Sequence, residues 1–366
     1  MTAWITRHDQ PVYRARQIFD ALYHRDAQSG GDLKQLPEPL RRELVSAFPP
    51  RVLQPVEERR SADGTVKYLS RLEDGETLET VLIPAPSRNT LCVSTQVGCA
   101  YACAFCASGL NGFQRNLTSG EIVQQLLLIQ RFLKKTAARS RVTNVVFMGM
   151  GESLANYVHL LKAIRILNSP EGLGIAARKI TISTVGLVPM IERLSKEGLQ
   201  LELAISLHAP HDDLRGQIMP VNRKYPVQEL LQACRAYART TRRLITFEYI
   251  LIDRVNDEPA HARDLAALLK GLMCKVNLIP CHPIPGRPFQ RPSNNRMFAF
   301  GRILKEGGIS CTLRKSRGLD IEGACGQLRL RQEEEAAPGA SALRLRQEEA
   351  VVKSSHAGSS RNHPRP

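Results

Sequence analysis

Strand-like and helix-like segments alternate along most of this chain, and that alternation constrains its fold more than any other feature. Thr118-Ser-Gly-Glu121 forms a capping box, which predicts the start of the first helix. Strand-like runs then precede helical patterns repeatedly, and such strand–helix units require a parallel sheet covered by helices. The expected strands are 142–148, 179–184, 201–207, 244–252, 275–279 and 309–313, and the expected helices are 122–133, 160–167, 190–197, 227–239, 260–272 and 297–305.

The residues that carry chemistry lie where the predicted strands end. In a barrel, functional residues gather at the C-terminal mouth from many strands, whereas an open sheet concentrates them at one switch point. About six strand–helix units are too few for a complete eightfold barrel. We therefore expect an α/β fold with a partial (β/α)6 barrel of the TIM type over residues 91–328. The strand-end positions are Cys99–Cys106, Gly149–Glu152, Ser183-Thr184, Ser206–His208 and Pro280–His282.

The rest of the chain differs in composition from the barrel segment. Residues 1–50 read as short amphipathic helices, which we interpret as a small N-terminal accessory domain and a candidate RNA-binding unit. Residues 51–90 are strand-like and form a β-rich connector. Residues 329–366 overlap the near-duplicates Leu328–Ala336 and Leu343–Ala350 and contain few large apolar residues. We expect this low-complexity tail to be disordered.

Three cysteines, Cys99, Cys103 and Cys106, lie within eight residues in the pattern CxxxCxxC. Ferredoxin-type clusters take four cysteines, but the next cysteine here is Cys234. Three thiolates would hold three corners of an iron–sulfur cube and leave one iron open, as catalytic zinc sites keep an open position. A structural zinc site is disfavoured because no second CxxC follows. Disulfides are disfavoured because the nine cysteines are odd in number and no secretory signal is recognisable.

Basic residues exceed acidic ones by a wide margin. The 366 residues include 51 Lys and Arg against 35 Asp and Glu, a formal net charge of +16. This excess indicates a polyanionic partner. We favour nucleic acid over a membrane, because the sequence shows no basic amphipathic anchor and no run of transmembrane length. We expect a cytoplasmic protein.

Several stretches together resemble the radical-SAM RNA adenine methyltransferases of the RlmN/Cfr group. The similarity runs from about Tyr13 to Leu328. It implies that the open iron of a [4Fe–4S] cluster binds S-adenosylmethionine, whose reductive cleavage yields a 5′-deoxyadenosyl radical. Members of the group methylate an adenosine in the peptidyl-transferase centre of 23S rRNA. The matching stretches are Leu91–Cys99, Arg115–Thr118, Gly149–Glu152, Ile205–Pro210, Val255–Asp257, Val276–Pro280 and Arg317–Leu328.

The resemblance also implies roles for individual residues. Adenine C2 is electron-poor and cannot attack a sulfonium methyl group, whereas a thiolate can. Cys325 matches the cysteine that carries the methyl group as S-methylcysteine and is then activated by the radical from a second S-adenosylmethionine. Cys92 matches the cysteine that removes the ring proton and forms a transient disulfide with Cys325, and Glu79 matches a proton acceptor. The implied metal ligands are Cys99, Cys103 and Cys106, and the implied cofactor-binding residues are Gly151, Glu152, Ser183, Ser206, Leu207, His208 and His282.

Two residues depart from the pattern of the group. Ser153 stands where the RlmN type usually has proline and the Cfr type a small residue. His282 replaces an asparagine that contacts S-adenosylmethionine, and imidazole cannot supply the paired donor and acceptor of an amide. The segment Arg317-Gly-Leu-Asp-Ile321, which leads into Cys325, is the fuller RlmN form and favours methylation at adenine C2.

The remaining functional expectations follow from the same resemblance. We expect two molecules of S-adenosylmethionine per turnover, an electron-donor protein such as a flavodoxin, and a monomeric enzyme. The expected substrate is 23S rRNA, with the adenosine 3′ of the tRNA anticodon as a second candidate. Two alternatives stay open at this point. One is Cfr-type methylation at C8 of the same rRNA adenosine, and the other is a non-catalytic RNA-binding protein with a structural metal centre.

Overall fold

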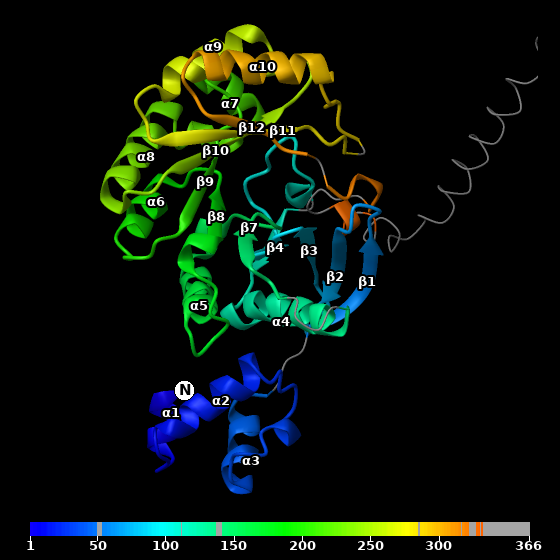
Figure 1. Ribbon diagram of the computed structural model, residues 1–366, viewed down its shortest axis with the longest axis vertical. Helices are drawn as coiled ribbons and strands as arrows, with labels where there is room; N and C mark the ends of the chain where they lie inside the picture. Colours follow the sequence, from blue (N-terminus) through cyan, green and yellow to red (C-terminus); the bar gives the residue numbers. More distant parts are fainter. Residues whose placement is uncertain are drawn as a thin grey trace, which may run out of the picture.

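The computed structural model describes residues 1–331 apart from 50–52, 111, 137–140, 285, 316, 322–326 and 330. It shows a helical N-terminal body and a larger body in which helices surround a curved sheet (Figure 1). Cys325 lies outside the described residues, as does the predicted tail from residue 332 onward. The α/β class with a parallel sheet is confirmed.

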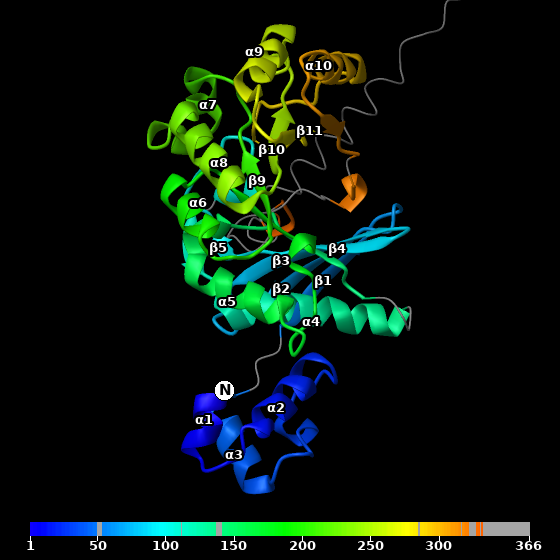
Figure 2. The same ribbon diagram turned by 60° about the vertical axis from the view of Figure 1, so that its left-hand side comes forward.

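The N-terminal helices pack around a small core of their own. Figures 1 and 2 show this body next to α4 and α5 of the larger body. Asp26 pairs with Arg131 on α4 at 2.7 Å, so an ion pair joins the two bodies. The prediction of short helices here is confirmed, and the RNA-binding role stays a prediction. The elements are α1 (Thr2–Arg7), α2 (Tyr13–Tyr23), the 3-10 turn η1 (Gly30–Asp32) and α3 (Glu38–Ala47), and their core contains Ile5, Ile18, Leu33, Leu36, Leu40 and Leu44.

Ten strands form one sheet in the order β1-β2-β3-β4-β7-β8-β9-β10-β11-β12. Strands β1 to β4 pair antiparallel, whereas β4 and β7 to β12 run parallel. The edge strands β1 and β12 do not pair with each other within the described residues, so the barrel is partial. The strands are β1 (Gln54–Arg60), β2 (Val66–Arg71), β3 (Thr77–Ala85), β4 (Arg88–Cys92), β7 (Asn144–Phe147), β8 (Ile180–Thr184), β9 (Glu202–Ser206), β10 (Ile245–Leu251), β11 (Cys274–Pro280) and β12 (Cys311–Leu313).

Helices cover the outer side of this sheet (Figure 1). The capping box is formed as predicted: the Thr118 N–H donates to Glu121 Oε2 at 2.7 Å, and the Glu121 N–H donates to Thr118 Oγ1 at 3.2 Å. Every helix in the part of the chain that the structure describes is too short or too polar to span a lipid bilayer. The helices are α4 (Ser119–Thr136), α5 (Tyr157–Asn168), α6 (Val188–Ser195), α7 (Asp212–Ile218), α8 (Val227–Thr241), α9 (Pro259–Leu269) and α10 (Asn294–Glu306), with 3-10 turns η2 (Ala107–Gly109), η3 (Ser153–Asn156), η4 (Ala177–Lys179), η5 (Pro220–Arg223) and η6 (Leu319–Ile321).

A short antiparallel ribbon, which the sequence pattern does not predict, encloses the cysteine loop. Its strands are β5 (Gln96–Gly98) and β6 (Phe113–Asn116). The Cys99 N–H donates to the Gly112 carbonyl at 2.9 Å, which closes the base of the loop. Gly98 has a φ of +72°, and a Cβ there would lie 1.9 Å from the Gly112 oxygen. Only glycine fits this crossing.

The C-terminal segment folds back onto the antiparallel strands. Asp320 accepts a hydrogen bond from the Ala62 N–H at 3.0 Å. Arg329 is buried, its N–H donates to Glu79 at 2.9 Å, and its guanidinium pairs with Glu76 at 2.9 Å. The predicted tail therefore begins too early, because its first residue is held by the sheet.

Candidate active site

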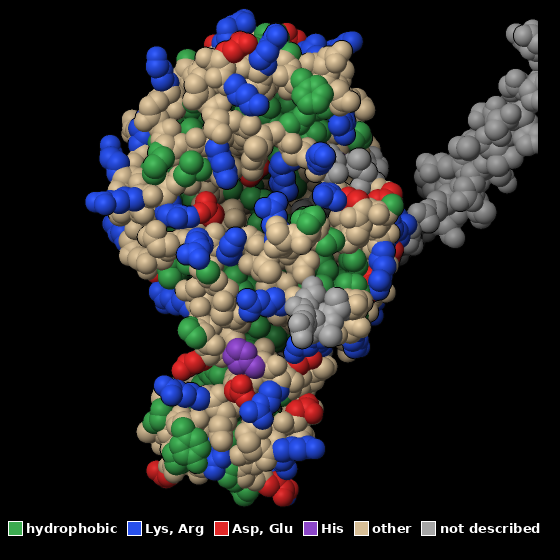
Figure 3. Space-filling view, in the orientation of Figure 1, with side chains coloured by type: hydrophobic (Ala, Val, Ile, Leu, Met, Phe, Trp, Pro, Cys, Tyr) green, Lys and Arg blue, Asp and Glu red, His purple; other side chains and the backbone are tan. Residues whose placement is uncertain are grey.

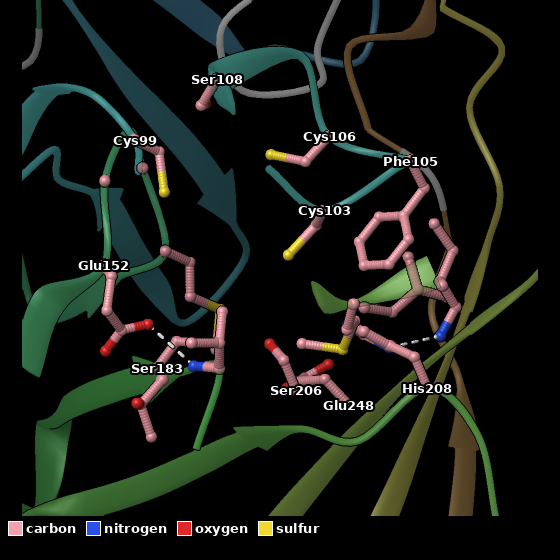
Figure 4. Close-up of a pocket in the computed structure, with 18 of the residues that line it drawn as sticks. Cys99, Cys103, Phe105, Cys106, Ser108, Glu152, Ser183, Ser206, His208 and Glu248 are labelled. Atoms are coloured by element: carbon pink, nitrogen blue, oxygen red, sulfur yellow. Dashed lines mark hydrogen bonds between the residues drawn. The ribbon is translucent and has the colours of Figure 1, made fainter. Parts of the chain in front are cut away.

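The cysteine loop faces a cavity at the C-terminal ends of the parallel strands. Cys99, Cys103 and Cys106 all line this cavity, which we call the cysteine cavity. Figure 4 shows their sulfur atoms directed toward the same space. The Ala104 N–H donates to the Ile218 carbonyl at 2.9 Å, which fixes the loop to the end of α7. The three thiols predicted to act together are thus brought together.

Burial disfavours the thiolate forms of this trio unless a cation is bound. Burial raises the pKa of the Cys99 thiol to about 12, and burial and the neighbouring Cys106 and Cys99 raise that of Cys103 well above its usual range. Within the described residues, no three His, Cys, Asp or Glu side chains lie close enough to hold one metal ion. Thiols are the donors that iron–sulfur clusters take, and all three line one cavity, so the chemistry of the donor set fits such a cluster.

Two glycines after β7 allow the chain to pass close to the loop that precedes the cysteines. A Cβ on Gly149 would lie 2.7 Å from the Ser94 backbone nitrogen, and one on Gly151 would lie 2.4 Å from Gln96 Cβ. Gly151 also has a φ of +94°. Gln96 Oε1 accepts the Glu152 N–H at 2.8 Å. This turn therefore sets the position of Glu152.

The Glu152 carboxylate is buried beside the cysteines (Figure 4). It accepts the Leu154 N–H at 3.0 Å and the Val185 N–H at 2.8 Å, one on each oxygen. Burial raises its pKa to about 7. The Thr184 hydroxyl is a further hydrogen-bond partner, and since an ionised carboxylate has about four acceptor positions, acceptor capacity remains for a ligand. A ligand with an ammonium group would stabilise the charged form.

Ser183, Ser206 and His208 line other parts of the same cavity, at or just after the ends of β8 and β9. His208 has a φ of +61°, and its Nδ1 accepts the Ile250 N–H at 3.0 Å. Burial lowers the pKa of His208 to about 3, so the ring is neutral. The Phe105 ring meets it edge-on, with 4.7 Å between ring centroids. The hydroxyl groups and the histidine backbone can position a polar ligand here.

The other predicted site residues lie elsewhere. Leu207 is fully buried and does not line the cysteine cavity. Cys92 and His282 line an adjoining cavity. Glu79 lines neither of these two cavities, and Cys325 is outside the described residues.

Glu79 belongs to a buried ion pair. Its Oε2 lies 2.8 Å from the Lys67 ammonium, and both side chains are almost inaccessible to solvent. Its Oε1 accepts the Arg329 N–H at 2.9 Å. In this arrangement Glu79 links β3 to the C-terminal segment, and its role as a proton acceptor stays a prediction.

The adjoining cavity combines apolar walls with a cationic rim. Its polar lining includes Cys92, His282, Arg314, Lys315 and Arg317. The pKa of His282 is lowered by burial and by nearby arginines, so its ring is neutral as well. The two cavities are neighbours because they share lining residues, which are Phe105, Cys106, Met148, Ile250, Ile279 and Arg314.

Arg215 on α7 is a central residue that sequence reasoning missed. It is fully buried and donates to the carbonyls of Val185 at 2.7 Å, Ser206 at 3.2 Å and Leu207 at 3.1 Å. It also donates to Asn222 Oδ1 at 2.9 Å. Arg215 therefore connects the ends of β8 and β9 beneath the cavity. No salt bridge to it occurs among the described residues, and no sequence signal distinguishes it from a surface arginine.

Glu248 is a second residue that was missed, although the sequence carries a signal for it. It interrupts the otherwise apolar segment predicted as strand 244–252. Carboxylates are rarely buried without a partner, so this position indicates a specific interaction. Glu248 lines the cysteine cavity (Figure 4).

Comparisons with known proteins agree with this site. The family description "Radical SAM superfamily" matches residues 93–266, the span from just before the cysteine loop to α9. A crystal structure of a radical SAM methyltransferase from Sphaerobacter thermophilus superposes with a TM-score of 0.85 at 49% identity, over 89% of this chain and 95% of that one. The chain is thus a member of the radical SAM superfamily.

Relatives with curated names identify the family within the radical SAM superfamily. A "probable dual-specificity RNA methyltransferase RlmN" of Geobacillus thermodenitrificans is 46% identical over 332 residues, 91% of each chain. A protein of the same name from Bacillus cereus is 44% identical over 335 residues, which is 92% of each chain. This chain belongs to the RlmN family of radical SAM RNA methyltransferases.

Proposed function

We propose that the protein methylates C2 of an adenosine in the peptidyl-transferase centre of 23S rRNA, and C2 of the adenosine 3′ of the tRNA anticodon. The observation that carries the proposal is the adjacency of the two cavities. The first is lined by the cysteine trio and Glu152, and the second by Cys92 and a cationic rim. A cofactor site next to a thiol and an anion-binding surface is what thiol-mediated RNA methylation requires.

The chain's own residues account for cofactor binding. Cys99, Cys103 and Cys106 would hold a [4Fe–4S] cluster, and Glu152 would receive the ammonium group of S-adenosylmethionine. When bound, the cluster supplies the electron that cleaves S-adenosylmethionine. Gln96 holds the Glu152 backbone in place, because its Oε1 accepts the Glu152 N–H. Two molecules of S-adenosylmethionine are used per turnover, one as methyl donor and one as radical source.

Cys325 and Cys92, the two other thiols of the proposed mechanism, act on the adenine base in different steps. Cys325 carries the methyl group as S-methylcysteine, and Cys92 takes the ring proton before a transient disulfide with Cys325 releases the product. Cys92 is buried at the end of β4 and lines the second cavity, which supports this role. On either side of Cys325 in the sequence, Asp320 binds the turn between β1 and β2, and Arg329 binds Glu79 on β3.

The cationic rim supports an RNA substrate. Figure 3 shows Lys and Arg side chains around the hollow in the larger body. Arg314, Lys315 and Arg317 line the second cavity, where they can bind phosphates on either side of a target base. The relatives' names state RNA methylation with dual specificity, in line with rRNA and tRNA as substrates. An electron-donor protein such as a flavodoxin supplies the reducing equivalents, and the enzyme acts as a monomer in the cytoplasm.

Ser153 gives no support to C8 methylation. Its hydroxyl donates to the Phe147 carbonyl at 3.1 Å within its own turn, and it does not line the cysteine cavity. The serine therefore has a local structural role that is independent of the position methylated.

Nucleoside analysis tests the proposal. The protein, reconstituted with iron and sulfide without oxygen, is incubated with unmodified 23S rRNA, S-adenosylmethionine and a reductant, and the RNA is digested for mass spectrometry. We expect 2-methyladenosine. Formation of 8-methyladenosine would establish the alternative chemistry, and absence of any methylated adenosine together with no cofactor cleavage would refute the enzyme assignment.

Two cysteine variants separate the thiol roles. Cys325→Ala should abolish RNA methylation, and peptide mass analysis of the wild type should locate S-methylcysteine at Cys325 alone. Cys92→Ala should accumulate a covalent protein–RNA adduct, because product release needs the second thiol. Cys234→Ala, a buried cysteine on α8, is the matched control and should retain both activities. Full turnover by Cys325→Ala would contradict the mechanism.

A further inference from the structure

Glu79 on β3 is held from two sides in the interior of the protein. Its Oε2 lies 2.8 Å from the ammonium group of Lys67 on β2, and its Oε1 accepts the backbone N–H of Arg329 at 2.9 Å. The Lys67 and Glu79 side chains are only 0% and 2% exposed. We call these three residues the Glu79 cluster. A buried ion pair contributes little net stability in general, because desolvation offsets the attraction, so stability alone does not explain this pair.

The sheet register places the Glu79 cluster beside Cys92. Lys67 pairs with Val81 on β3, and Val81 pairs with Cys92 on β4. Glu79 lies two residues before Val81 on the same strand, so both side chains point to the same face of the sheet. Val81 and Cys92 line the second cavity, whereas Glu79 is not part of its lining. The carboxylate therefore lies next to the wall of the cavity that contains Cys92.

The third member of the cluster belongs to the C-terminal segment. Arg329 is four residues after Cys325 in the sequence. The two residues just before Arg329 are also held, because Leu328 is fully buried and the Gln327 side chain donates to a backbone carbonyl at 3.1 Å. Before Cys325, Asp320 accepts a backbone N–H of the β1–β2 turn at 3.0 Å. The described residues on both sides of Cys325 are thus bound to the antiparallel strands or to the loops beside them.

We propose that Glu79, oriented by Lys67, is a positioning residue for the transfer of a methyl group to Cys325. This inference rests on the proposed function, because it assigns the carboxylate to one step of that mechanism. Two observations favour it over the role of proton acceptor. Glu79 lines neither of the two cavities, and each of its oxygens already faces a donor.

The step itself depends strongly on the position of the sulfur. The Cys325 thiol loses its proton to solvent, and the thiolate forms a bond to the methyl carbon of S-adenosylmethionine. The bond from that carbon to the sulfonium sulfur breaks, and S-adenosylhomocysteine keeps the electron pair, so no oxidant or reductant is needed. Such an attack is fast only when the reacting atoms are held close together and aligned. The Glu79 cluster meets this requirement by holding the chain four residues after the thiol.

Methylation of Cys325 in the absence of RNA tests the assignment, because no ring proton is removed in this step. Anaerobically reconstituted protein whose Cys325 is unmethylated is incubated with S-adenosylmethionine that carries a deuterated methyl group. Peptide mass analysis follows the labelled fraction of Cys325. In Glu79→Gln we expect the labelling rate to fall about tenfold or more, because a hydrogen bond to a charged group is lost. Hydrogen exchange of the full-length protein should become faster in the peptide 327–331.

A double variant separates positioning from stability. Lys67→Met with Glu79→Leu removes both buried charges, and replacement of a buried ion pair by apolar side chains is often neutral for stability. We expect this protein to unfold at the same urea concentration as the wild type and still to label Cys325 slowly. Glu76→Gln is the matched control, since Glu76 is partly exposed and binds the Arg329 guanidinium. It should change the labelling rate by less than about twofold.

The possible outcomes separate the three roles of Glu79. Wild-type labelling of Cys325 in Glu79→Gln, combined with loss of RNA methylation, would overturn the inference in favour of a proton acceptor. Recovery of the labelling rate in the double variant would overturn it in favour of a purely stabilising role. Failure of the wild type to take up the label would instead refute the proposed function, and hydrogen exchange would still report whether Glu79 holds the C-terminal segment.

Discussion

At the scale of single residues, Gly151 is under two separate constraints. Its φ of +94° disfavours any side chain, and a Cβ would lie 2.4 Å from Gln96. We expect Gly151→Ala to lower the free energy of unfolding by about 3 kcal/mol and to weaken S-adenosylmethionine binding, because Gln96 also holds Glu152. Gly75 has a φ of +89° but no atom near its Cβ, so Gly75→Ala should cost only about 1 kcal/mol. If urea titrations gave equal losses of unfolding free energy for Gly151→Ala and Gly75→Ala, this prediction would be contradicted.

His208 predicts a specific dependence of stability on pH. Burial depresses its folded-state pKa to about 3, whereas the unfolded chain takes up a proton near pH 6.5. The stability that the neutral ring contributes is therefore complete above pH 6.5 and is lost as the pH falls toward 3. We expect about 1 kcal/mol of loss between pH 7.5 and 5.5 from this residue. His208→Asn should lack that component, and His24→Gln, at an exposed position, should retain it. Urea unfolding at both pH values gives the comparison.

At the scale of elements, hydrogen bonds from Arg215 hold α7 against the ends of β8 and β9. Its guanidinium donates to carbonyls that follow β8 and end β9, so its loss leaves buried acceptors without donors. We expect Arg215→Met to lower the free energy of unfolding by about 3 kcal/mol or more, and Arg215→Lys to recover only part of it. Arg223→Met, at an exposed position on η5, should change stability by less than about 0.5 kcal/mol. If Arg215→Met were as stable as the Arg223→Met control, Arg215 would not have this stabilising role.

How far the sequence predicts these elements depends on their length. The parallel strands and their helices are long enough to show a hydrophobic period, and they occur where the pattern predicts them. Strands β5 and β6 contain only a few residues each, and helix α7 has only one or two turns. None of them is long enough for a hydrophobic period to show in the sequence. The cysteine trio was predicted to act together because its spacing is local. His282 was assigned to the cofactor by resemblance; it lines the second cavity, as Cys92 does, and its role toward the cofactor stays a prediction.

At the scale of the whole molecule, the charge excess predicts how RNA binding depends on salt. Each cation that contacts a phosphate adds about 0.7 to 0.9 to the slope of log affinity against log salt. We expect Lys315→Gln, at the rim of the second cavity, to reduce that slope by about one for an rRNA fragment. Lys270→Gln, next to α9 on the outer side, should leave the slope unchanged. Identical slopes for both variants, measured by filter binding, would place the RNA elsewhere.

The docking of the C-terminal segment onto the antiparallel strands has a consequence for biosynthesis. Arg329 binds Glu79 across 250 positions of sequence, and Arg331 binds Glu57 across 274. During translation, strands β1 and β3, which carry Glu57 and Glu79, are therefore synthesised long before Arg329 and Arg331. Until Arg329 and Arg331 are synthesised, Glu79 and Glu57 lack these partners, so this flank of the sheet reaches its final contacts only late in synthesis.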